Sequence, residues 1–170
     1  PNTVRAPYDT MYSHLKFEEP RTLHAALESS PAWSPTKGKN SAHKLKQAGM
    51  AKYFGMVKCI DDNVGKILQY LKESGLEQDT IVIFTSDHGD SMGEHAKHNK
   101  GTPWETSAGV PFIIRYPEHI KAGKLIHTAY TTADFTPTIL GIMGVDPNKD
   151  DFHGIDGSAE FLGCAAETRE

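Results

Sequence analysis

Cysteine is scarce in this sequence, with two residues among 170, and long apolar runs are absent. Cys59 and Cys164 form no CxxC pair, so the sequence predicts neither a disulfide framework nor a zinc knuckle. No apolar stretch approaches the roughly 20 residues that a membrane-spanning helix needs, so no membrane span is expected. Long basic runs are missing too. Together with the net charge of −4, this argues against non-specific binding to nucleic acid.

The remaining composition is that of an ordinary globular domain. Hydrophobic residues make up 38% and charged residues 24%, and 170 residues are enough for one domain with a core. The chain opens at Pro1 without a methionine, and its first stretch is rich in proline. We therefore expect a piece of a longer protein, with any signal peptide upstream. The compartment stays open, and a periplasmic or secreted parent protein is compatible with these features.

Hydrophobic periodicity divides the chain into three parts. Residues 1–43 are predicted to be irregular and rich in proline, with a short helix over residues 21–28 as the one candidate element. Residues 44–163 are predicted to form the α/β domain. Residues 164–170 are predicted to be a tail.

Within the domain, apolar residues three and four positions apart predict a long helix over residues 42–74, which Gly75 would end. We expect this helix to lie on a sheet face. Two short apolar runs, 81–84 and 110–114, predict strands buried on both faces. Residues 131–143 predict a further helix. This order of elements indicates an α/β fold, a layered sheet flanked by helices.

Chemically active side chains follow the first predicted strand directly. In open α/β sheets, ligands gather at the carboxyl ends of strands. Asp87 offers carboxylate oxygens and His88 an imidazole nitrogen, and Gly89 permits the sharp turn that would point both into one cavity. Carboxylates suit calcium, magnesium or manganese, and an imidazole also admits zinc, so the pair predicts a divalent metal site. The alternative is that Asp87 caps a turn and His88 is an ordinary surface residue.

The polar loop that follows contains a second group of candidates. Lys100 precedes Gly101, and its amine could bind the anionic oxygens of a sulfate or phosphate ester as the leaving oxygen departs. His95 and His98 could donate hydrogen bonds to the same anion, transfer a proton, or orient metal ligands. The alternative for each histidine is a solvated or structural side chain. Trp104 is expected to pack beneath the loop rather than to line a pocket.

Three segments, in order, carry a family resemblance across residues 50–162. They read YFGMVKCIDDNVGKIL, IVIFTSDHGDSMGEHAKHNKGTPWETSAGVPFIIRYP and TADFTPTILGIMGV. This succession resembles the arylsulfatase-like sulfatases of the alkaline phosphatase superfamily, in the C-terminal part of their catalytic domain. The resemblance implies a hydrolase with part of an alkaline-phosphatase-like fold.

The resemblance also implies roles for individual residues. Asp87 matches the family's metal-binding aspartate, and His88 matches the next position, which also reaches the metal. Lys100 matches the lysine that contacts the sulfate group, and is expected to be both catalytic and substrate-binding. His95 matches the histidine of the Gly-Glu-His turn and is a catalytic candidate, while His98 is a substrate-binding candidate. Calcium is the usual metal of sulfatases, and a histidine at position 88 leaves manganese open.

One feature of sulfatases is not found in these 170 residues. Relatives carry a Cys-x-Pro-x-Arg or Ser-x-Pro-x-Arg segment whose first residue is oxidised to formylglycine, the group that attacks sulfur. This segment is absent here. The resemblance implies that the parent protein hydrolyses sulfated small molecules or carbohydrates, with a nucleophile that these residues do not include. We expect this chain alone to bind metal weakly and to be inactive.

Two other readings of the sequence stay open. The same scaffold serves phosphodiesterases and phosphonate monoester hydrolases, and an α/β layer can also be a non-catalytic interaction module. A sheet that lacks its earlier strands would expose an edge, so self-association of the isolated chain is expected. Asp61 and Asp62 lie within the long predicted helix, where we expect them to face solvent or pair with Lys58 and Lys66 rather than bind metal.

Overall fold

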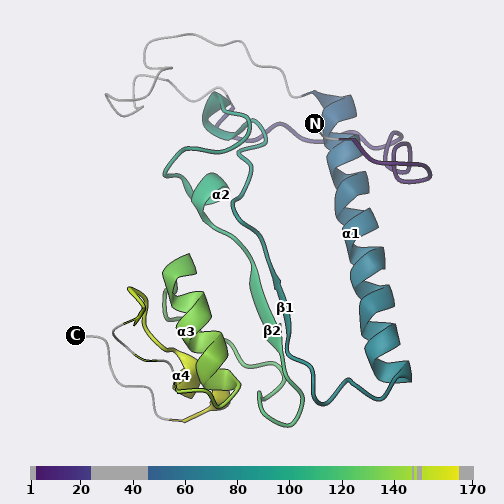
Figure 1. Cartoon of the computed structure of the whole chain (residues 1–170). Coiled ribbons are helices and arrows are strands. Elements are labelled where there is room, and N and C mark those ends of the chain that lie inside the picture. Colours follow the sequence, from purple (N-terminus) through teal and green to yellow (C-terminus); the bar gives the residue numbers. More distant parts are fainter. Residues whose placement is uncertain (1–2, 24–45, 147, 149–150, 165–170) are drawn as a thin grey trace. The chain divides into compact units, whose positions relative to one another are not determined.

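The computed structural model describes residues 3–23, 46–146, 148 and 151–164 (Figure 1). Within them lie four α-helices, one short 3-10 helix and two strands. In chain order the elements are α1 (Gln47–Glu73), β1 (Val82–Thr85), η2 (Glu94–Ala96), α2 (Glu105–Ala108), β2 (Phe112–Arg115), α3 (Thr132–Ile142) and α4 (Ser158–Leu162). The predicted α/β class is confirmed, as a mixture of helices and a small two-stranded sheet, β1-β2.

The chain forms two compact units, and the division passes through both strands. One unit comprises residues 1–73 and 84–113, and the other comprises residues 74–83 and 114–170. The segment after β1 and the loop that leads to β2 belong to the first unit. All the candidate site residues therefore lie in one unit. None of the described helices is long and apolar enough to cross a membrane.

Helix α1 confirms the long helix predicted from apolar spacing, although it begins later, at Gln47. Residues 42–45 lie outside the described part. The helix ends where expected, because Gly75 takes a left-handed conformation with φ of +72°. Glycine adopts this conformation without the penalty that a β-carbon brings.

An N-terminal segment packs along one side of α1. The carbonyl oxygen of Tyr8 comes so close to the helix that a β-carbon at Gly55 would lie 2.1 Å from it. The rings of Tyr12 and Phe17 lie 6.2 Å and 5.1 Å from the ring of Phe54, measured between centroids. Residues 21–23 form a turn, and the rest of the helix predicted over 21–28 lies outside the described residues.

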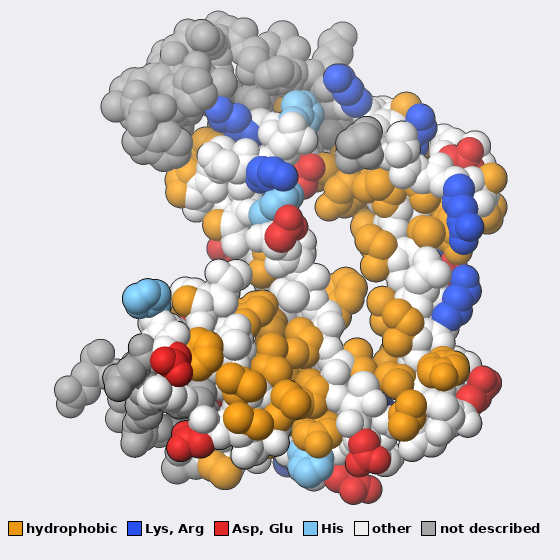
Figure 2. Space-filling model, viewed as in Figure 1, with side chains coloured by type: hydrophobic (Ala, Val, Ile, Leu, Met, Phe, Trp, Pro, Cys, Tyr) orange, Lys and Arg blue, Asp and Glu red, His pale blue; other side chains and the backbone are white. Residues whose placement is uncertain are grey.

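Another face of α1 carries apolar side chains that the described residues leave exposed. Val57, Ile60 and Ile67 are 50%, 52% and 57% exposed. Figure 2 shows hydrophobic side chains at the surface along α1, at the right of the view. Helical spacing places them on one stripe, away from Gly55. The expected sheet face beneath this stripe is not supplied by the described residues, so its identity stays a prediction.

Strands β1 and β2 form at the two predicted apolar runs, each shifted by one or two residues towards the C-terminus. The prediction that both are buried on both faces is wrong for the described chain. Phe84 is 37% exposed and Ile113 is 61% exposed. The reason is that a sheet of two strands has too few neighbouring layers to cover both faces. In the second unit, Arg115 pairs with Glu77 at 2.5 Å.

Helices α3 and α4 pack against each other in the second unit. Thr131 and Asp134 form a capping box at the start of α3, in which Thr131 N donates to the Asp134 carboxylate at 2.8 Å. The other Asp134 oxygen accepts from Ile155 N at 2.9 Å, which ties the following loop to the helix. Asp156 accepts from Ser158 N at 2.8 Å, a bond between residues two apart that is typical of an aspartate in a turn.

Candidate functional site

The segment that follows β1 turns sharply at Asp87 and His88. Ser86 Oγ donates to the His88 carbonyl oxygen at 2.9 Å, and His88 N donates to Asp87 Oδ1 at 2.9 Å. These short-range bonds fix the backbone on which the two candidate metal ligands stand. Asp87 is exposed, whereas His88 is half-buried.

Gly89 continues the turn and is held against the chain that follows the loop. Its N–H donates to the Ser107 carbonyl oxygen at 2.9 Å. A β-carbon at this position would lie 2.2 Å from the Thr106 carbonyl oxygen. The sequence predicts a glycine here for its conformational freedom, but the structure gives a different reason, which is the close approach of two backbones.

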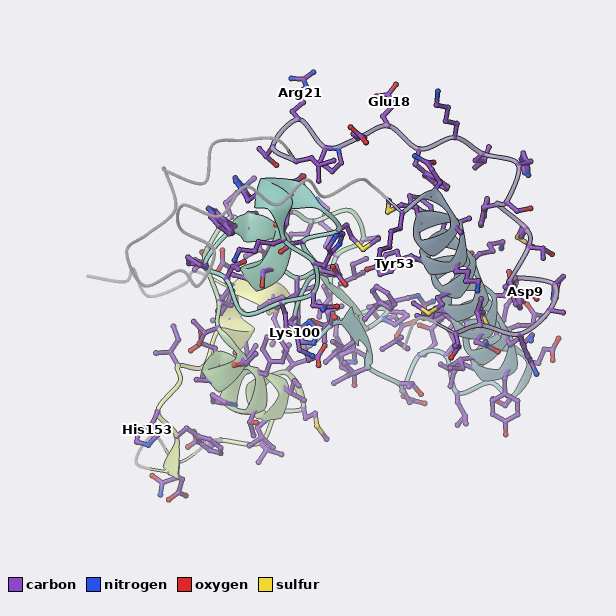
Figure 3. The ribbon with its side chains drawn as sticks, turned by 90° about the horizontal axis from the view of Figure 1, so that it is seen from above. Asp9, Glu18, Arg21, Tyr53, Lys100 and His153 are labelled. Carbon is purple, nitrogen blue, oxygen red and sulfur yellow. The ribbon has the colours of Figure 1, made fainter. Side chains whose placement is uncertain are left out.

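Two charged side chains, those of Lys100 and Asp87, converge on the Nε2 atom of His88. His88 Nδ1 lies 2.8 Å from the Gly89 carbonyl oxygen and donates its proton there, which leaves Nε2 as an acceptor. Lys100 Nζ donates to Nε2 at 2.8 Å. The Lys100 side chain is labelled in Figure 3. Asp87 Oδ2 lies 3.3 Å from the same nitrogen. The structure thus brings together Asp87, His88 and Lys100, as the sequence predicts.

The electrostatics around Asp87 favour its charged form. Desolvation is the largest single influence and raises its pKa, but the nearby His88 and Lys100, and the backbone N–H of His88, together outweigh it. The pKa of Asp87 therefore lies below its ordinary value. An ionised carboxylate can bind a cation, and the cationic amine beside it can bind an anionic ester.

Asp90 organises the loop that leads from the turn to Lys100. Its Oδ1 atom accepts from Met92 N at 2.9 Å and from Asn99 N at 3.0 Å. Met92 and Asn99 both have left-handed backbones, with φ of +45° and +65°. Such conformations cost free energy in residues other than glycine, so they need bonds of this kind to hold them.

Ser107 holds the loop from its far end. This buried residue accepts at Oγ from Gly101 N at 3.1 Å and, at a longer 3.4 Å, from Thr102 N. Its carbonyl oxygen accepts from Gly89, as described above. One residue of α2 therefore contacts both the segment with His88 and the segment with Lys100.

His95 and His98 occupy the same loop in different surroundings. The His95 ring stacks on the Trp104 ring, with centroids 4.3 Å apart and planes 12° apart. His95 N donates to Thr22 Oγ1 at 3.0 Å, which holds a left-handed residue with φ of +51°. His98 is exposed. Trp104 therefore packs on the loop as expected, and its contact there is the His95 ring. The catalytic role of His95 and the substrate-binding role of His98 stay predictions.

The donors present fit part of a divalent metal site. Two atoms that carry lone pairs, Asp87 Oδ2 and His88 Nε2, lie close enough to bind one cation together, and the bond from Nδ1 to a carbonyl is the usual way to orient a metal-binding histidine. Among the described residues, no group of three or more His, Cys, Asp or Glu side chains gathers in this way. Calcium takes six to eight oxygen ligands, so this pair would need further ligands.

Comparison with known proteins decides the family. Residues 10–145 match the family described as Sulfatase, which is most of the chain. This chain belongs to the sulfatase family. An N-acetylglucosamine-6-O-sulfatase from Bacteroides thetaiotaomicron is 38% identical over 114 residues, which cover 67% of this chain and 20% of that protein. The sulfatase chain described here thus spans about a fifth of the length of this curated relative.

Solved structures show the same fold. A protein solved in complex with its substrate D-glucosamine-2-N,6-O-disulfate has a TM-score of 0.61 and 34% identity, covering 72% of this chain and 25% of that one. A phosphonate monoester hydrolase of Agrobacterium radiobacter has a TM-score of 0.72 and 29% identity, covering 98% of this chain and 36% of that one. The predicted alkaline-phosphatase-like fold is confirmed for the part that this sulfatase chain contains.

Proposed function

We propose that this chain is the later part of a metal-dependent sulfuric ester hydrolase and supplies ligands for a cation and for the sulfate group. The observation that carries the proposal is the convergence of Asp87 and Lys100 on His88 Nε2, at 3.3 Å and 2.8 Å. The nucleophile, a formylglycine, would come from residues outside these 170. Alone, the chain is expected to bind metal weakly and to turn over no ester.

Lys100 is assigned to the ester. Its ammonium group contacts His88 and belongs to an exposed side chain, which can move from His88 to an anion. Hydrolysis transfers negative charge to the oxygen that leaves sulfur, and a fixed positive charge beside that oxygen stabilises the transition state more than the ground state. Sulfated carbohydrates or small sulfate esters are the substrates this assignment favours, in keeping with the sulfated substrate named for one structural neighbour.

Asp87 and His88 are assigned to a divalent cation, with calcium as the first choice and manganese as the second. When bound, the cation would act as a Lewis acid on the oxygens of the ester. His88 contributes its Nε2 atom, and the bond from Nδ1 to the Gly89 carbonyl oxygen fixes the orientation of the ring. Asp87 contributes an ionised carboxylate. His95, held flat against Trp104, is assigned to proton transfer or orientation near the leaving group.

A second candidate is hydrolysis of phosphate diesters or phosphonate monoesters by the same scaffold. The imidazole at position 88 favours it, because nitrogen donors suit manganese and zinc better than calcium. The likeness to a phosphonate monoester hydrolase at 29% identity supports it as well. Initial rates of the full-length protein with 4-nitrophenyl sulfate, a 4-nitrophenyl phosphodiester and a phenylphosphonate monoester would separate the two candidates.

The experiment that tests the assignment replaces the amine of Lys100 in the full-length protein. Lys100→Met keeps the length of the side chain and removes its charge, so kcat/KM should fall about 100- to 1,000-fold, the usual effect of losing one transition-state donor. Lys52→Met, at an exposed position on α1, is the matched control and should leave kcat/KM unchanged. A Lys100→Met protein within about twofold of wild type would contradict the proposal.

The metal assignment has a separate test. Asp87→Asn with His88→Ala should lower the bound calcium or manganese per protein, measured by calorimetry after chelation and reloading. Asp79→Asn, an exposed carboxylate in the second unit, is the control. Unchanged metal content in the double variant would count against these two ligands.

A further inference from the structure

Lys100 stands between two left-handed backbones. Asn99 before it has φ of +65°, and Gly101 after it has φ of +89°. This conformation aims the Lys100 side chain back towards His88, where Nζ and Nε2 lie 2.8 Å apart. A lysine side chain is a flexible four-carbon stem, so the backbone position from which it starts sets the region that its amine can reach.

Each of these two flanking residues is held by a side-chain oxygen. Asp90 Oδ1 accepts from Asn99 N at 3.0 Å, and Ser107 Oγ accepts from Gly101 N at 3.1 Å. Asp90 also holds the left-handed Met92 at 2.9 Å with the same oxygen. Hydrogen bonds to an ionised acceptor are about twice as strong as neutral ones, so Asp90 is the stronger of the two holds.

Ser107 also connects Lys100 to its target. Its carbonyl oxygen accepts from Gly89 N at 2.9 Å, on the residue directly after His88. Ser107 therefore holds the backbone next to the amine of Lys100 and the backbone next to the imidazole of His88. Neither Asp90 nor Ser107 itself needs to touch a substrate for this to work.

We propose that Asp90 and Ser107 are positioning residues that act through Lys100, by fixing the backbone on each side of it. This inference rests on the function proposed for Lys100. It goes beyond that function by assigning the aim of the amine to two residues that bind neither ester nor metal. Their loss should reduce kcat more than it raises KM, because the displaced amine loses more of its contact with the charge that develops in the transition state than with the bound ester.

The test is a set of double-mutant cycles in the full-length protein, with 4-nitrophenyl sulfate as substrate. Asp90→Ala should lower kcat about 10- to 100-fold, the range expected when a catalytic group is misplaced by about an ångström. Ser107→Ala should lower it about tenfold, for the loss of one buried hydrogen bond. In the Lys100→Met background, each should lower kcat less than about twofold, because residues that act through one group are not additive.

Two controls separate aim from general damage. Asp90→Asn keeps an acceptor oxygen for both N–H groups and should recover most of the activity. Thr106 is the neighbour of Ser107, and its buried hydroxyl has no hydrogen-bond partner among the described residues. Thr106→Val should therefore leave kcat unchanged. If Asp90→Ala fails to fold, Ser107→Ala compared with Thr106→Val carries the test.

Equal losses in the wild-type and Lys100→Met backgrounds would overturn the positioning role, as would an Asp90→Asn protein as impaired as Asp90→Ala. A Lys100→Met protein with normal kcat would instead refute the function proposed for the site. The two failures are therefore distinguishable.

Discussion

At the scale of single residues, the turn at Gly89 depends on the absence of a side chain. A β-carbon there would meet the Thr106 carbonyl oxygen at 2.2 Å, and backbone cannot give way as a flexible side chain can. We expect Gly89→Ala to lower the free energy of unfolding by about 1–3 kcal/mol, the usual cost of overpacking. Chemical denaturation would measure this loss, with Ala108→Ser at an exposed position as the control. An unchanged midpoint would mean that the two backbones lie further apart.

The stack of His95 on Trp104 makes a second prediction at this scale. The face of the indole shields the imidazole at 4.3 Å, so Trp104→Ala should move the ring-proton resonances of His95 downfield in a histidine-labelled NMR sample. The loss of the aromatic pair should also cost about 0.5–1.5 kcal/mol of stability. Trp104→Phe retains a ring and should preserve part of both effects. Resonances of His95 that ignore the alanine substitution would argue against the stack.

The sequence predicts the residues of the site better than it predicts what holds them. Asp87, His88 and Lys100 are recognisable because a strand followed by polar residues marks a ligand edge, and the structure brings all three together. Asp90 and Ser107 were missed, since their partners are backbone N–H groups that any sequence would offer. The one available signal was an aspartate in a short polar turn, a residue type that often binds nearby backbone N–H groups.

At the scale of elements, α1 offers a matched pair of glycines. Gly55 faces the Tyr8 carbonyl oxygen, whereas nothing lies within 4 Å of a β-carbon at Gly65. Gly55→Ala should therefore destabilise the contact between α1 and the N-terminal segment by about 1–3 kcal/mol. Gly65→Ala should stabilise the helix by about 0.5–1 kcal/mol, because alanine loses less backbone entropy. Urea unfolding of both variants would check the opposite signs, and a shared sign would refute the contact.

The same segment is tied to α1 by a charged group that titrates. Lys58, first, and then the Tyr8 hydroxyl hold the pKa of Asp62 below its ordinary value. Tyr8 Oη donates to Asp62 at 2.8 Å. A lowered pKa in the folded state means that this stabilisation is present above the ordinary value of about 3.9 and is lost as the pH falls through the folded value.

Lys58→Met should therefore raise the pKa of Asp62, which carbon-detected NMR titration of the carboxyl group would follow. The variant should also weaken the part of the stability that is lost in acid. Lys66→Met should change the titration of Asp62 less, because Lys66 lowers its pKa more weakly than Lys58 does. If Lys58→Met left the Asp62 titration where it is in the wild type, the ion pair would have no part in it. The pairing of Asp61 and Asp62 with Lys58 agrees with their expected place on a helix surface.

Elements were predictable where a local pattern decides them. Apolar spacing located α1, and the two apolar runs located β1 and β2 to within two residues. Burial of the strands on both faces was not predictable in this way, because it depends on neighbours that are distant in the chain. Phe84 and Ile113 read as core residues, yet the described chain leaves them partly exposed.

At the scale of the whole molecule, the apolar stripe of α1 determines how the isolated chain should behave. Val57, Ile60 and Ile67 are each exposed by half or slightly more. Contiguous apolar surface of this kind drives association in water. We expect the 170-residue chain to self-associate in light scattering. Val57→Glu with Ile67→Lys should reduce the mean mass, while Lys52→Glu on a polar position of α1 should not. A monodisperse wild-type monomer would contradict this expectation.

The double use of Ser107 also bears on where such a protein can accept extra residues. Ser107 accepts hydrogen bonds from both Gly89 and Gly101. Extra residues between Thr102 and Ser107 would therefore move Lys100 away from His88. The turn at Gly123 has an exposed left-handed backbone with open space around it, and no such double duty. Inserted residues should therefore be tolerated at Gly123, whereas the same insertion after Thr102 should abolish turnover.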